Sequence, residues 1–554
     1  MTTNGKLHVI PLGGLGEFGM NMMALRFGDE IIVIDSGKMF PEDSLLGVEA
    51  IIPDMSYIRE HRDKILGLFL THGHEDHIGA VPYFLKNADV PVFGTRLTLG
   101  LVKMRLREHD LLGDADLREV ERGDSVELGN FSVEFVGVSH GIPDSCALAV
   151  TTPAGVAIHT GDFKLDQTPL DGQTTDYHTL ARYGDAGVLL LLSDSTNVER
   201  QGYTFSEKEV YDDFERVFSK ARGKILVAAF ASHLHRMQQI VDLAEQFGRK
   251  VAFCGRSMEQ NSRLAQELGY LHVPVGLEIS PKQVAGMPAD EVVVIASGSQ
   301  AEPRSALTKI ALDEHQHVRL QPGDVVALSA RKIPGNERSI TTLINHLHRR
   351  GAEVEHNGTL DLHVSGHAFS GEMKMMLNLV MPRFFVPIHG EYHQLHLHAQ
   401  LARKTCVEAE NVLLAESGDV IAVDEDGMEI VDRVEVGRTM IDASLNESIS
   451  EDTVRDRRYM AQEGLVAPVI VVRRKHGPKV VKIHFITKGL RSDEDHLALL
   501  EGAEGLITEL VEESTLEQLS DEDHMQAKIG KALRRLMRRH LRSYPMILPR
   551  ILEV

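Results

Sequence analysis

Short apolar runs separated by turn residues dominate the first 200 residues of the chain. The runs are rich in β-branched and aromatic residues and are bounded by Gly, Pro or Asp, a pattern that predicts buried strands. They lie at 7–12, 31–35, 65–72, 131–140 and 188–194, with a helical stretch at 78–87 between two of them. This part of the chain is therefore expected to form a sheet-rich α/β domain.

The pattern of predicted strands and helices changes at Ser206. Ser206 and Glu209 form a capping box, which predicts a helix that continues to about Ala221. Strands then alternate with helices in the spacing of a parallel, doubly wound unit of about 150 residues. The strands are expected at 224–231, 250–255, 291–298 and 324–330. Since 384–393 returns to an apolar strand, a His turn and a helix, this unit is expected to be an insertion in the first domain.

The chain beyond residue 450 is expected to form a third, smaller part. A polar stretch there is interpreted as a linker, and a hairpin is predicted over 467–489 with its turn at His476, Gly477 and Pro478. Two helical segments of opposite charge follow. Residues 493–523 include twelve acidic residues and no Lys or Arg, whereas 528–550 include eight basic residues and no acidic one. Together these elements predict a small α+β module.

A glycine-rich segment near the N-terminus matches a dinucleotide-binding fingerprint in its spacing alone. Gly14, Gly16 and Gly19 follow a strand, and Asp35 ends the next strand about 20 residues on. Only ten residues separate Gly19 from that strand, too few for the helix of a parallel crossover. We therefore predict an antiparallel hairpin, in which the glycines let backbone pass close to another part of the molecule.

Composition and charge narrow the class of protein. The chain has 554 residues, 43% hydrophobic and 25% charged, which is typical of a globular protein of about three domains. Cys146, Cys254 and Cys406 lie far apart, which excludes a disulfide scaffold and a zinc ribbon. No signal sequence or membrane span is evident, so we expect a soluble, reduced, cytoplasmic protein. The net charge of -22 opposes encounter with phosphates, so charge alone argues against a nucleic-acid partner.

The strongest chemical signal is the segment from Thr71 to His77, which directly follows an apolar strand. Residues i and i+2 of an extended strand point the same way, so His72 and His74 can converge on one metal. After the turn, Asp76 and His77 are adjacent and can face a second metal. Four ligand-type residues in six positions favour a metal site over a polar loop that happens to be rich in His.

This HxHxDH motif, followed by His140 and Asp162, resembles the metallo-β-lactamase hydrolase superfamily. The resemblance implies two metals bridged by Asp162 and a metal-bridging hydroxide, which forms because two cations lower the pKa of water. Mixed imidazole and carboxylate ligands suit two zinc ions, with manganese as an alternative. The other implied ligands are His72, His74 and His140 for one metal, and Asp76, His77 and His389 for the other.

Further motifs resemble the β-CASP nucleases of this superfamily, and together with the C-terminal module they make the whole chain similar to the bacterial ribonuclease J family. The motifs are 193–197 (SDSTN), 363–367 (HVSGH) and 387–391 (PIHGE), with GSQAEP at 298–303 and IPGNE at 333–337. The implied fold class is α/β: a metallo-β-lactamase αββα sandwich, an inserted doubly wound β-CASP domain and a small C-terminal α+β domain. The expected bounds are 1–205 and 370–449 for the sandwich, 206–369 for the β-CASP domain, 450–465 for the linker and 466–554 for the C-terminal domain.

The resemblance implies a two-metal ribonuclease of RNA maturation and decay, including rRNA processing and mRNA decay. Its implied activities are 5′-to-3′ exonuclease trimming that favours 5′-monophosphorylated single-stranded RNA, and endonuclease cleavage. Asp76, Asp194 and His367 are expected in catalysis, with His367 protonating the leaving oxygen and Asp194 orienting His367. Glycine lets backbone N–H groups approach a phosphate, so the substrate-binding segment is expected to be His363, Val364, Ser365, Gly366 and His367.

The resemblance also concerns a further ion and protein partners. A structural calcium ion is suggested between Gly47, Glu49 and Asp442, whose oxygens suit a hard cation. A homodimer or higher homo-oligomer is implied, mediated by the C-terminal module, along with partners in an RNA-decay complex and no membrane. Solvated charged faces are the alternative explanation of the two oppositely charged segments.

Several other histidines have simpler explanations. His159 ends a strand, where orienting a ligand is commoner than binding metal. His233 and His235 either contact RNA or begin a helix. Three more histidines follow the ligand His389 on a helix and are expected at the surface, because they would overfill the site: His393, His396 and His398.

Three other functions are weighed against a ribonuclease. A scaffold paralogue in an RNA-processing complex predicts a missing ligand, and none is missing. A hydrolase of lactams or thioesters has no need of an insertion of about 150 residues. A DNA nuclease of the same superfamily is the nearest alternative, since RNA over DNA rests on resemblance alone. Two positions depart from the family pattern, Gly141 in place of Ser and Ala301 in place of Gly, and they concern positioning rather than the reaction.

Overall fold

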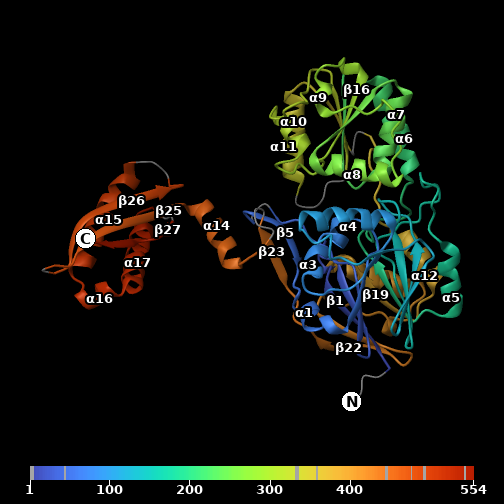
Figure 1. Cartoon of the computed structure of the whole chain (residues 1–554), viewed down its shortest axis with the longest axis horizontal. Helices are drawn as coiled ribbons and strands as arrows, with labels where there is room; N and C mark the ends of the chain where they lie inside the picture. Colours follow the sequence, from blue (N-terminus) through green and yellow to red (C-terminus); the bar gives the residue numbers. More distant parts are fainter. Residues whose placement is uncertain are drawn as a thin grey trace. The chain divides into compact units, whose positions relative to one another are not determined.

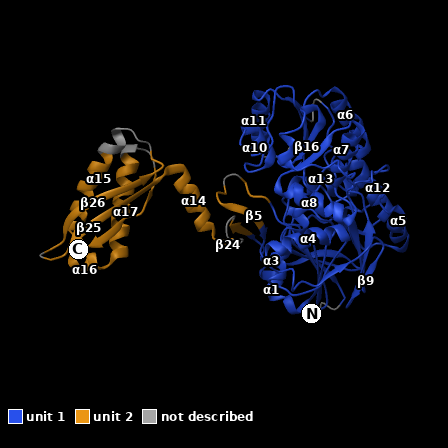
Figure 2. Cartoon of the chain, turned by 45° about the horizontal axis from the view of Figure 1, so that its top comes forward, with its two compact units in different colours: residues 1–39, 52–438 blue, residues 40–51, 439–554 orange. Residues whose placement is uncertain are grey.

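The structure is a computed structural model that describes residues 5–42, 45–330, 336–356, 360–442, 447–475, 477–490, 494–541 and 544–554. The chain forms two compact units, coloured separately in Figure 2. The first contains residues 1–39 and 52–438, and the second contains residues 40–51 and 439–554. Within the described ranges, no helix is long and apolar enough to cross a membrane.

The first unit is built on a sandwich of two sheets (Figure 1). The larger sheet has the order β22 (Met428–Arg433), β21 (Asp419–Val423), β1 (Leu7–Gly13), β3 (Met22–Phe27), β4 (Glu30–Ile34), β6 (Ile65–Phe69), β7 (Val92–Gly94) and β8 (Leu117–Glu119). The smaller sheet has the order β19 (Phe384–Ile388), β13 (Leu190–Asp194), β12 (Gly155–His159), β11 (Cys146–Thr152), β10 (Phe131–Gly137) and β9 (Ser125–Leu128). Alternate residues of the strands face inward, so that Leu7 and Val9 share one core with Phe135 and Leu192.

Helices cover both outer faces of the sandwich. On the smaller sheet, Ile158 and Phe385 pack with Leu180 and Leu377 from the helices above them. These helices are α5 (Tyr177–Ala186), α12 (Ser370–Val380) and α13 (Tyr392–Thr405), while α4 (Arg96–Glu108) packs against β7 and β8 of the larger sheet. The predicted αββα sandwich is confirmed.

Two local predictions in the sandwich can be compared with the structure. The helical stretch expected at 78–87 is two short helices, α2 (Glu75–Ile78) and α3 (Val81–Leu85), separated at Gly79. The antiparallel hairpin in place of a nucleotide-binding crossover is confirmed, since β3 pairs with β4 with Met23 opposite Ile34.

Shorter elements of the two units are β2 (Leu15–Gly16), β5 (Val48–Pro53), α1 (Ser56–Glu60), α9 (Pro281–Val284), β20 (Gly390–Glu391), β23 (Arg438–Asp442) and β24 (Ser448–Ile449).

The inserted segment forms the predicted parallel, doubly wound domain. Its sheet has the order β15 (Lys250–Cys254), β16 (Val292–Ala296), β14 (Ile225–Ala229), β17 (Val325–Ser329) and β18 (Glu353–His356). Figure 1 shows α6 (Glu207–Lys220) and α7 (Leu234–Gln246) on one side, and α10 (Ala306–Leu312) and α11 (Glu337–Arg349) on the other, with α8 (Arg256–Leu268) below. The capping box of Ser206 and Glu209 is confirmed at the start of α6.

The second unit ends in a sheet covered on one face by helices. The predicted hairpin is confirmed as β25 (Leu465–Arg473) and β26 (Lys479–Lys488), although His476 of its turn lies outside the described residues. Ile470 packs with Ile507 and Ile529 in the core of this part. The other elements are α15 (Glu494–Glu512), α16 (Leu516–Ser520), α17 (Glu522–Leu541), β27 (Met546–Ile547) and β28 (Arg550–Glu553). The stretch expected as a linker contains a helix, α14 (Glu451–Glu463), which Ser450 caps.

Candidate active site

Three imidazoles converge beyond the end of β6. His72 and His74 follow that strand, and Nε2 of His72 and of His140 each lie 3.1 Å from His74 Nδ1. Asp162 completes the group, with its Oδ2 3.6 Å from His72 Nε2 and 3.7 Å from His140 Nε2. The four ligand atoms lie within 4.8 Å of one another, a spacing that suits one ion.

A second group of ligand atoms shares Asp162. Nε2 of His77 lies 3.6 Å from Asp76 Oδ2 and 3.3 Å from Asp162 Oδ2. His389, which follows β19, has its Nε2 3.4 Å from Asp76 Oδ2 and 3.6 Å from Asp162 Oδ1. The fold therefore brings together all seven residues that the sequence predicts as metal ligands.

Charge and hydrogen bonding in both groups fit divalent cations. Burial lowers the pKa of His72 and His140 well below the usual value and that of His74 to about 4, which keeps these imidazoles neutral with a free lone pair. In the second group the carboxylate of Asp162 outweighs burial and raises the pKa of His77 and His389. Asp162 Oδ1 is buried and has no hydrogen-bond partner among the described residues, as expected of a carboxylate oxygen that coordinates a metal ion.

The glycine-rich N-terminal segment and the loop after β4 support this motif. Asn21 N donates to the carbonyl oxygen of Asp76 at 3.1 Å, and Lys38 N donates to that of Glu75 at 3.0 Å. A Cβ on Gly37 would lie 1.6 Å from the Asp76 carbonyl oxygen, so only glycine allows this approach. The close approach to the metal motif is therefore made at Gly37 and not at Gly14, Gly16 or Gly19; a Cβ on Gly14 would instead lie 2.3 Å from Asn21 Oδ1.

Asp35 is a residue whose role the sequence did not reveal. It lies in the left-handed region, with φ of 59°, and its Oδ2 lies 2.7 Å from His77 Nδ1. The backbone N–H and the hydroxyl of Thr71 also donate to its carboxylate, each at 2.8 Å. Because a carboxylate only accepts, His77 carries its proton on Nδ1 and presents Nε2 to the metal. The sequence offered one indication of this role: Asp35 is a charged residue at the end of a buried apolar strand.

Two other ligands are oriented in the same way. His140 Nδ1 lies 2.7 Å from the carbonyl oxygen of Gly366, and His389 Nδ1 lies 2.7 Å from the Thr196 hydroxyl oxygen. These partners come from two of the motifs that resemble β-CASP nucleases. Both motifs therefore fix metal ligands as well as lining the site.

His367 and Asp194 form an ion pair beside the two groups. His367 Nδ1 lies 2.8 Å from Oδ2 of the fully buried Asp194 at the end of β13. Burial would lower the pKa of His367, but Asp194 and Asp162 together raise it. The His367 ring stacks on His389 at 5.4 Å and meets His140 edge-on at 5.0 Å. The His367 imidazole is thereby held next to the predicted metal ligands, in surroundings that favour its protonated form.

The rest of the segment 363–367 is also close to the ligands. Asn197 Nδ2 donates to Ser365 Oγ at 2.7 Å, and a Cβ on Gly366 would come 2.8 Å from His140 Cε1. Val364 is buried and His363 is half-buried, and desolvation lowers the pKa of His363 to about 3. Gly366 is therefore required for close contact with His140, and Ser365 is already tied to Asn197 in this arrangement.

The other histidines divide between support and surface. His159 Nδ1 accepts from Gly161 N at 3.1 Å, next to the ligand Asp162, and His233 caps α7 by accepting from Arg236 N. The prediction that His398 lies at the surface is wrong, because it faces inward on α13 and contacts Ser195 Oγ at 3.0 Å. Of the histidines weighed in the sequence analysis, His393 and His396 are exposed and His235 is partly exposed. His235 Nε2 lies 3.2 Å from Asp171 Oδ2.

The residues expected to hold calcium are arranged around an arginine. Arg457 Nη2 lies 2.9 Å from Asp442 Oδ2, and its Nη1 lies 3.4 Å from the carbonyl oxygen of Gly47. Glu49 is exposed in β5. Because a guanidinium already supplies the positive charge between these oxygens, the arrangement does not fit a calcium ion.

Comparison with known families covers most of the chain. Residues 15–195 match the model described as metallo-beta-lactamase superfamily, and 222–347 match ribonuclease J, beta-CASP domain. Residues 337–412 match a Zn-dependent metallo-hydrolase RNA specificity domain, and 452–554 match the ribonuclease J C-terminal domain. Relatives of the whole chain carry the same name. Ribonuclease J of Thermus thermophilus is 41% identical over 99% of this chain and 95% of its own length.

The chain belongs to the ribonuclease J family. Ribonuclease J of Mycobacterium tuberculosis is 39% identical over all of this chain and 98% of its own length. Ribonuclease J2 of Bacillus subtilis is 36% identical over 99% of each chain. A solved protein of unknown function from Enterococcus faecalis V583 covers 75% of this chain with a TM-score of 0.53 at 17% identity, which supports the fold alone. This member of the ribonuclease J family is a metal-dependent hydrolase that acts on RNA.

The two departures from the family pattern differ in their structural effect. A Cβ at Gly141 would lie 3.7 Å from His74 Cε1, an ordinary contact, so the backbone leaves room for a Cβ there. Ala301 has φ of 63°, a conformation that favours glycine. The substitution at Ala301 therefore strains the backbone, whereas Gly141 leaves space beside a ligand.

Proposed function

We propose that this chain is a two-metal ribonuclease that removes nucleotides 5′ to 3′ from 5′-monophosphorylated single-stranded RNA and also cleaves RNA internally. Zinc is the proposed metal, with manganese as the alternative. The observation that carries the proposal is the pair of ligand groups that share Asp162, next to the ion pair of His367 and Asp194.

The reaction divides between the metals and the chain's own residues. Ions held by the two ligand groups that share Asp162 would activate a water at neutral pH and would offset charge that develops on the phosphate. Asp35, Thr196 and Gly366 fix the orientation of three imidazole ligands, so no reorganisation is needed during the reaction. His367 donates a proton to the leaving 3′ oxygen. Asp194 keeps the His367 ring oriented and its pKa raised, which maintains that proton.

The preference for a 5′ monophosphate is proposed on the basis of the segment 363–367. His363 is neutral, and its Nδ1 is buried without a hydrogen-bond partner among the described residues, so it is available to a ligand. The Gly366 carbonyl oxygen lies 2.7 Å from His140 Nδ1, so a terminal phosphate on this segment is close to the metal ligands. Removal of nucleotides one at a time from a 5′ end requires this proximity.

Cleavage of matched substrates tests the function. The metal-loaded enzyme is incubated with 5′-monophosphate, 5′-hydroxyl and 5′-triphosphate forms of one RNA and with single-stranded DNA of the same sequence. We expect mononucleotides from the monophosphorylated RNA, and loss of that activity in an Asp76→Ala, His77→Ala variant. His393→Ala is the matched control, because His393 is exposed and follows the ligand His389 closely. Equal turnover of DNA would refute the proposal, as would activity that survives the double substitution.

A homodimer or higher homo-oligomer is also proposed, with partners in an RNA-decay complex. The opposite charges of α15 and α17 support it, since the outer sides of these helices remain exposed at Glu504, Glu509 and Arg535. Light scattering coupled to gel filtration measures the mass. A monomer at micromolar concentration would refute this part of the proposal.

A further inference from the structure

The segment 363–367 is held at both of its ends by buried charged side chains that lie outside it. Before the segment, the Leu362 carbonyl oxygen accepts from Arg236 Nη1 and, at 2.7 Å, from the Ser329 hydroxyl. After the segment, Glu372 accepts from Phe369 N at 2.8 Å. The conformation of five consecutive loop residues is thereby determined from two elements, α7 and α12.

Arg236 is fully buried, with no exposed surface. Its Nε donates to Gln239 Oε1 at 2.9 Å, and its Nη2 donates to Glu207 Oε2 at 2.5 Å. The guanidinium also lies over the Phe214 ring, 5.2 Å from its centroid. A buried charge is expensive unless it is paired and hydrogen-bonded, and all these partners hold the Arg236 fork in one orientation. The Leu362 carbonyl is consequently bound by a rigid donor.

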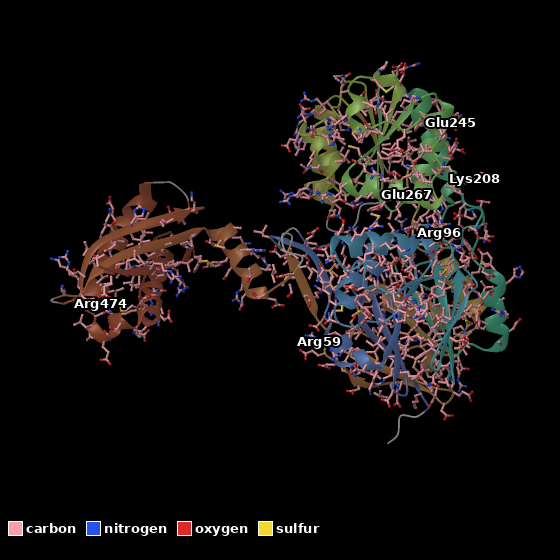
Figure 3. All side chains as sticks on the ribbon, in the orientation of Figure 1. Arg59, Arg96, Lys208, Glu245, Glu267 and Arg474 are labelled. Atoms are coloured by element: carbon pink, nitrogen blue, oxygen red, sulfur yellow. The ribbon has the colours of Figure 1, made fainter. Side chains whose placement is uncertain are left out.

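The same network joins the inserted domain to the sandwich. Glu207 N donates to Asp166 Oδ2 at 3.3 Å, and the Lys164 ammonium lies 3.2 Å from that oxygen. Lys164 is two residues from the ligand Asp162, and its backbone N–H donates to the Ser139 carbonyl, next to the ligand His140. In Figure 3, Lys208 lies at the start of α6, where the inserted domain meets the sandwich; Glu207, one residue before it, is buried.

Glu372 makes the matching connection on the other side. Its Oε1 accepts from Leu165 N at 2.9 Å, in the strand-like stretch that follows Asp162. Its Oε2 accepts from Thr204 N and Phe369 N, each at 2.8 Å. Glu372 is 1% exposed, so one buried carboxylate ties the end of the segment 363–367 to the chain beside the metal ligands.

We propose that Arg236 and Glu372 are positioning residues, which place the segment 363–367 and the RNA 5′ end that it holds against the metal ligands. The inference rests on the proposed role of that segment in binding substrate. Neither residue reaches the reacting atoms, so their effect is on placement. Because a displacement of about 1 Å can lower a rate about 100-fold, modest movement of the segment is sufficient to impair RNA cleavage.

Two variants separate placement from folding. Arg236→Gln alone leaves Glu207 buried without its main partner, so Arg236→Gln, Glu207→Gln serves as a charge-balanced pair that removes the donor to Leu362. Glu372→Gln keeps the volume of the side chain and weakens its hold on Phe369 and Thr204. Matched controls are Arg349→Gln on α11 and Glu245→Gln on α7, both exposed residues of the inserted domain.

Two substrates and one structural readout are compared on metal-loaded enzyme. Bis(p-nitrophenyl) phosphate reports on the metal centre, because its leaving group needs no proton and it has no 5′ end. Monophosphorylated RNA reports on the segment as well. In the charge-balanced pair and in Glu372→Gln, we expect kcat/KM for RNA to fall about 100-fold, mainly through kcat, while bis(p-nitrophenyl) phosphate turnover and metal content stay within twofold. Amide exchange of His367 and Ala368 should accelerate in both.

The outcomes distinguish the inference from the proposed function. A parallel loss on both substrates would overturn the inference, since it would indicate general damage, and so would unchanged RNA cleavage or amide exchange. Variants that melt below the assay temperature would assign these residues a structural role only and would also overturn it. Wild-type enzyme that hydrolyses bis(p-nitrophenyl) phosphate but leaves RNA intact would refute the proposed function, and amide exchange would then still test the positioning.

Discussion

Substitution of Asp35 by Asn tests how the chain prepares a metal ligand. The Asp35 carboxylate accepts three hydrogen bonds, two from Thr71 at 2.8 Å and one from His77 Nδ1 at 2.7 Å. Asparagine has the same shape but only one accepting oxygen. If that oxygen keeps the bond from Thr71 N, the amide N–H faces His77 Nδ1. The proton of His77 then moves to Nε2, the atom that points at Asp76 and Asp162.

The expected magnitude follows from the loss of this orienting bond. Removing a hydrogen-bond partner of a metal ligand weakens metal binding about 10-fold to 100-fold, equivalent to about 1.4–2.8 kcal/mol. We expect Asp35→Asn to need that much more metal for half-maximal RNA cleavage, with most activity restored at saturating metal. Asp63→Asn is the control, because the Asp63 side chain is 92% exposed. Half-maximal activity at an unchanged metal concentration would refute the reasoning.

Three more substitutions test other parts of the structure. Glu75 is half-buried between Lys38 and Arg105, and although desolvation raises its pKa, the two cations lower it to about 2. Glu75→Gln should therefore lower the free energy of unfolding by about 2 kcal/mol at neutral pH. This difference should shrink as the pH falls below 4.5, the pKa of the carboxyl in the unfolded chain. Urea titrations at several pH values measure the difference, and a difference that does not change with pH would contradict the prediction. Ala301→Gly should raise the melting temperature through a gain of about 0.5–1 kcal/mol, since glycine tolerates φ of 63°, and a decrease would show that the strain is absent. Calcium should leave the melting temperature of the wild type unchanged and raise that of Arg457→Gln, whereas a calcium-dependent rise in the wild type would contradict the role of this guanidinium.

Four of the seven metal ligands could be predicted from the residues alone, because their signal is local. His72, His74, Asp76 and His77 fall within six positions after a strand, and the strand geometry itself directs two of them to one point. The sandwich and the inserted domain were equally accessible, because apolar runs of strand length mark buried sheets. His140, Asp162 and His389 needed the family resemblance, since no spacing along the chain connects them.

What could not be predicted depends on contacts between distant residues. Asp35 lies 42 positions from His77, and Arg236 lies 126 positions from Leu362, so neither bond is visible in a pattern of neighbouring residues. His398 was misplaced because coordination number says how many ligands fit, but not which face of α13 is buried. The polar stretch 450–465 was interpreted as a linker because its charges hide the helix signal that Ser450 provides.

The net charge of -22 is the clearest case of an average that misleads. It argues against RNA, yet the chain belongs to a family of ribonucleases. Two of the acidic groups, Asp76 and Asp162, lie among metal ligands, where bound cations reverse the local field. Net charge describes the outer surface and says little about a buried catalytic centre.

Mononucleotide release from 5′-monophosphorylated RNA, followed as metal is added back to chelated enzyme, tests the central claim most directly. Asp162 is shared by both ligand groups, so Asp162→Ala should remove both sites together. We predict that release by the wild type depends on two ions per chain and is absent from Asp162→Ala. Full release by the chelated enzyme, or by Asp162→Ala, would contradict a shared two-metal centre.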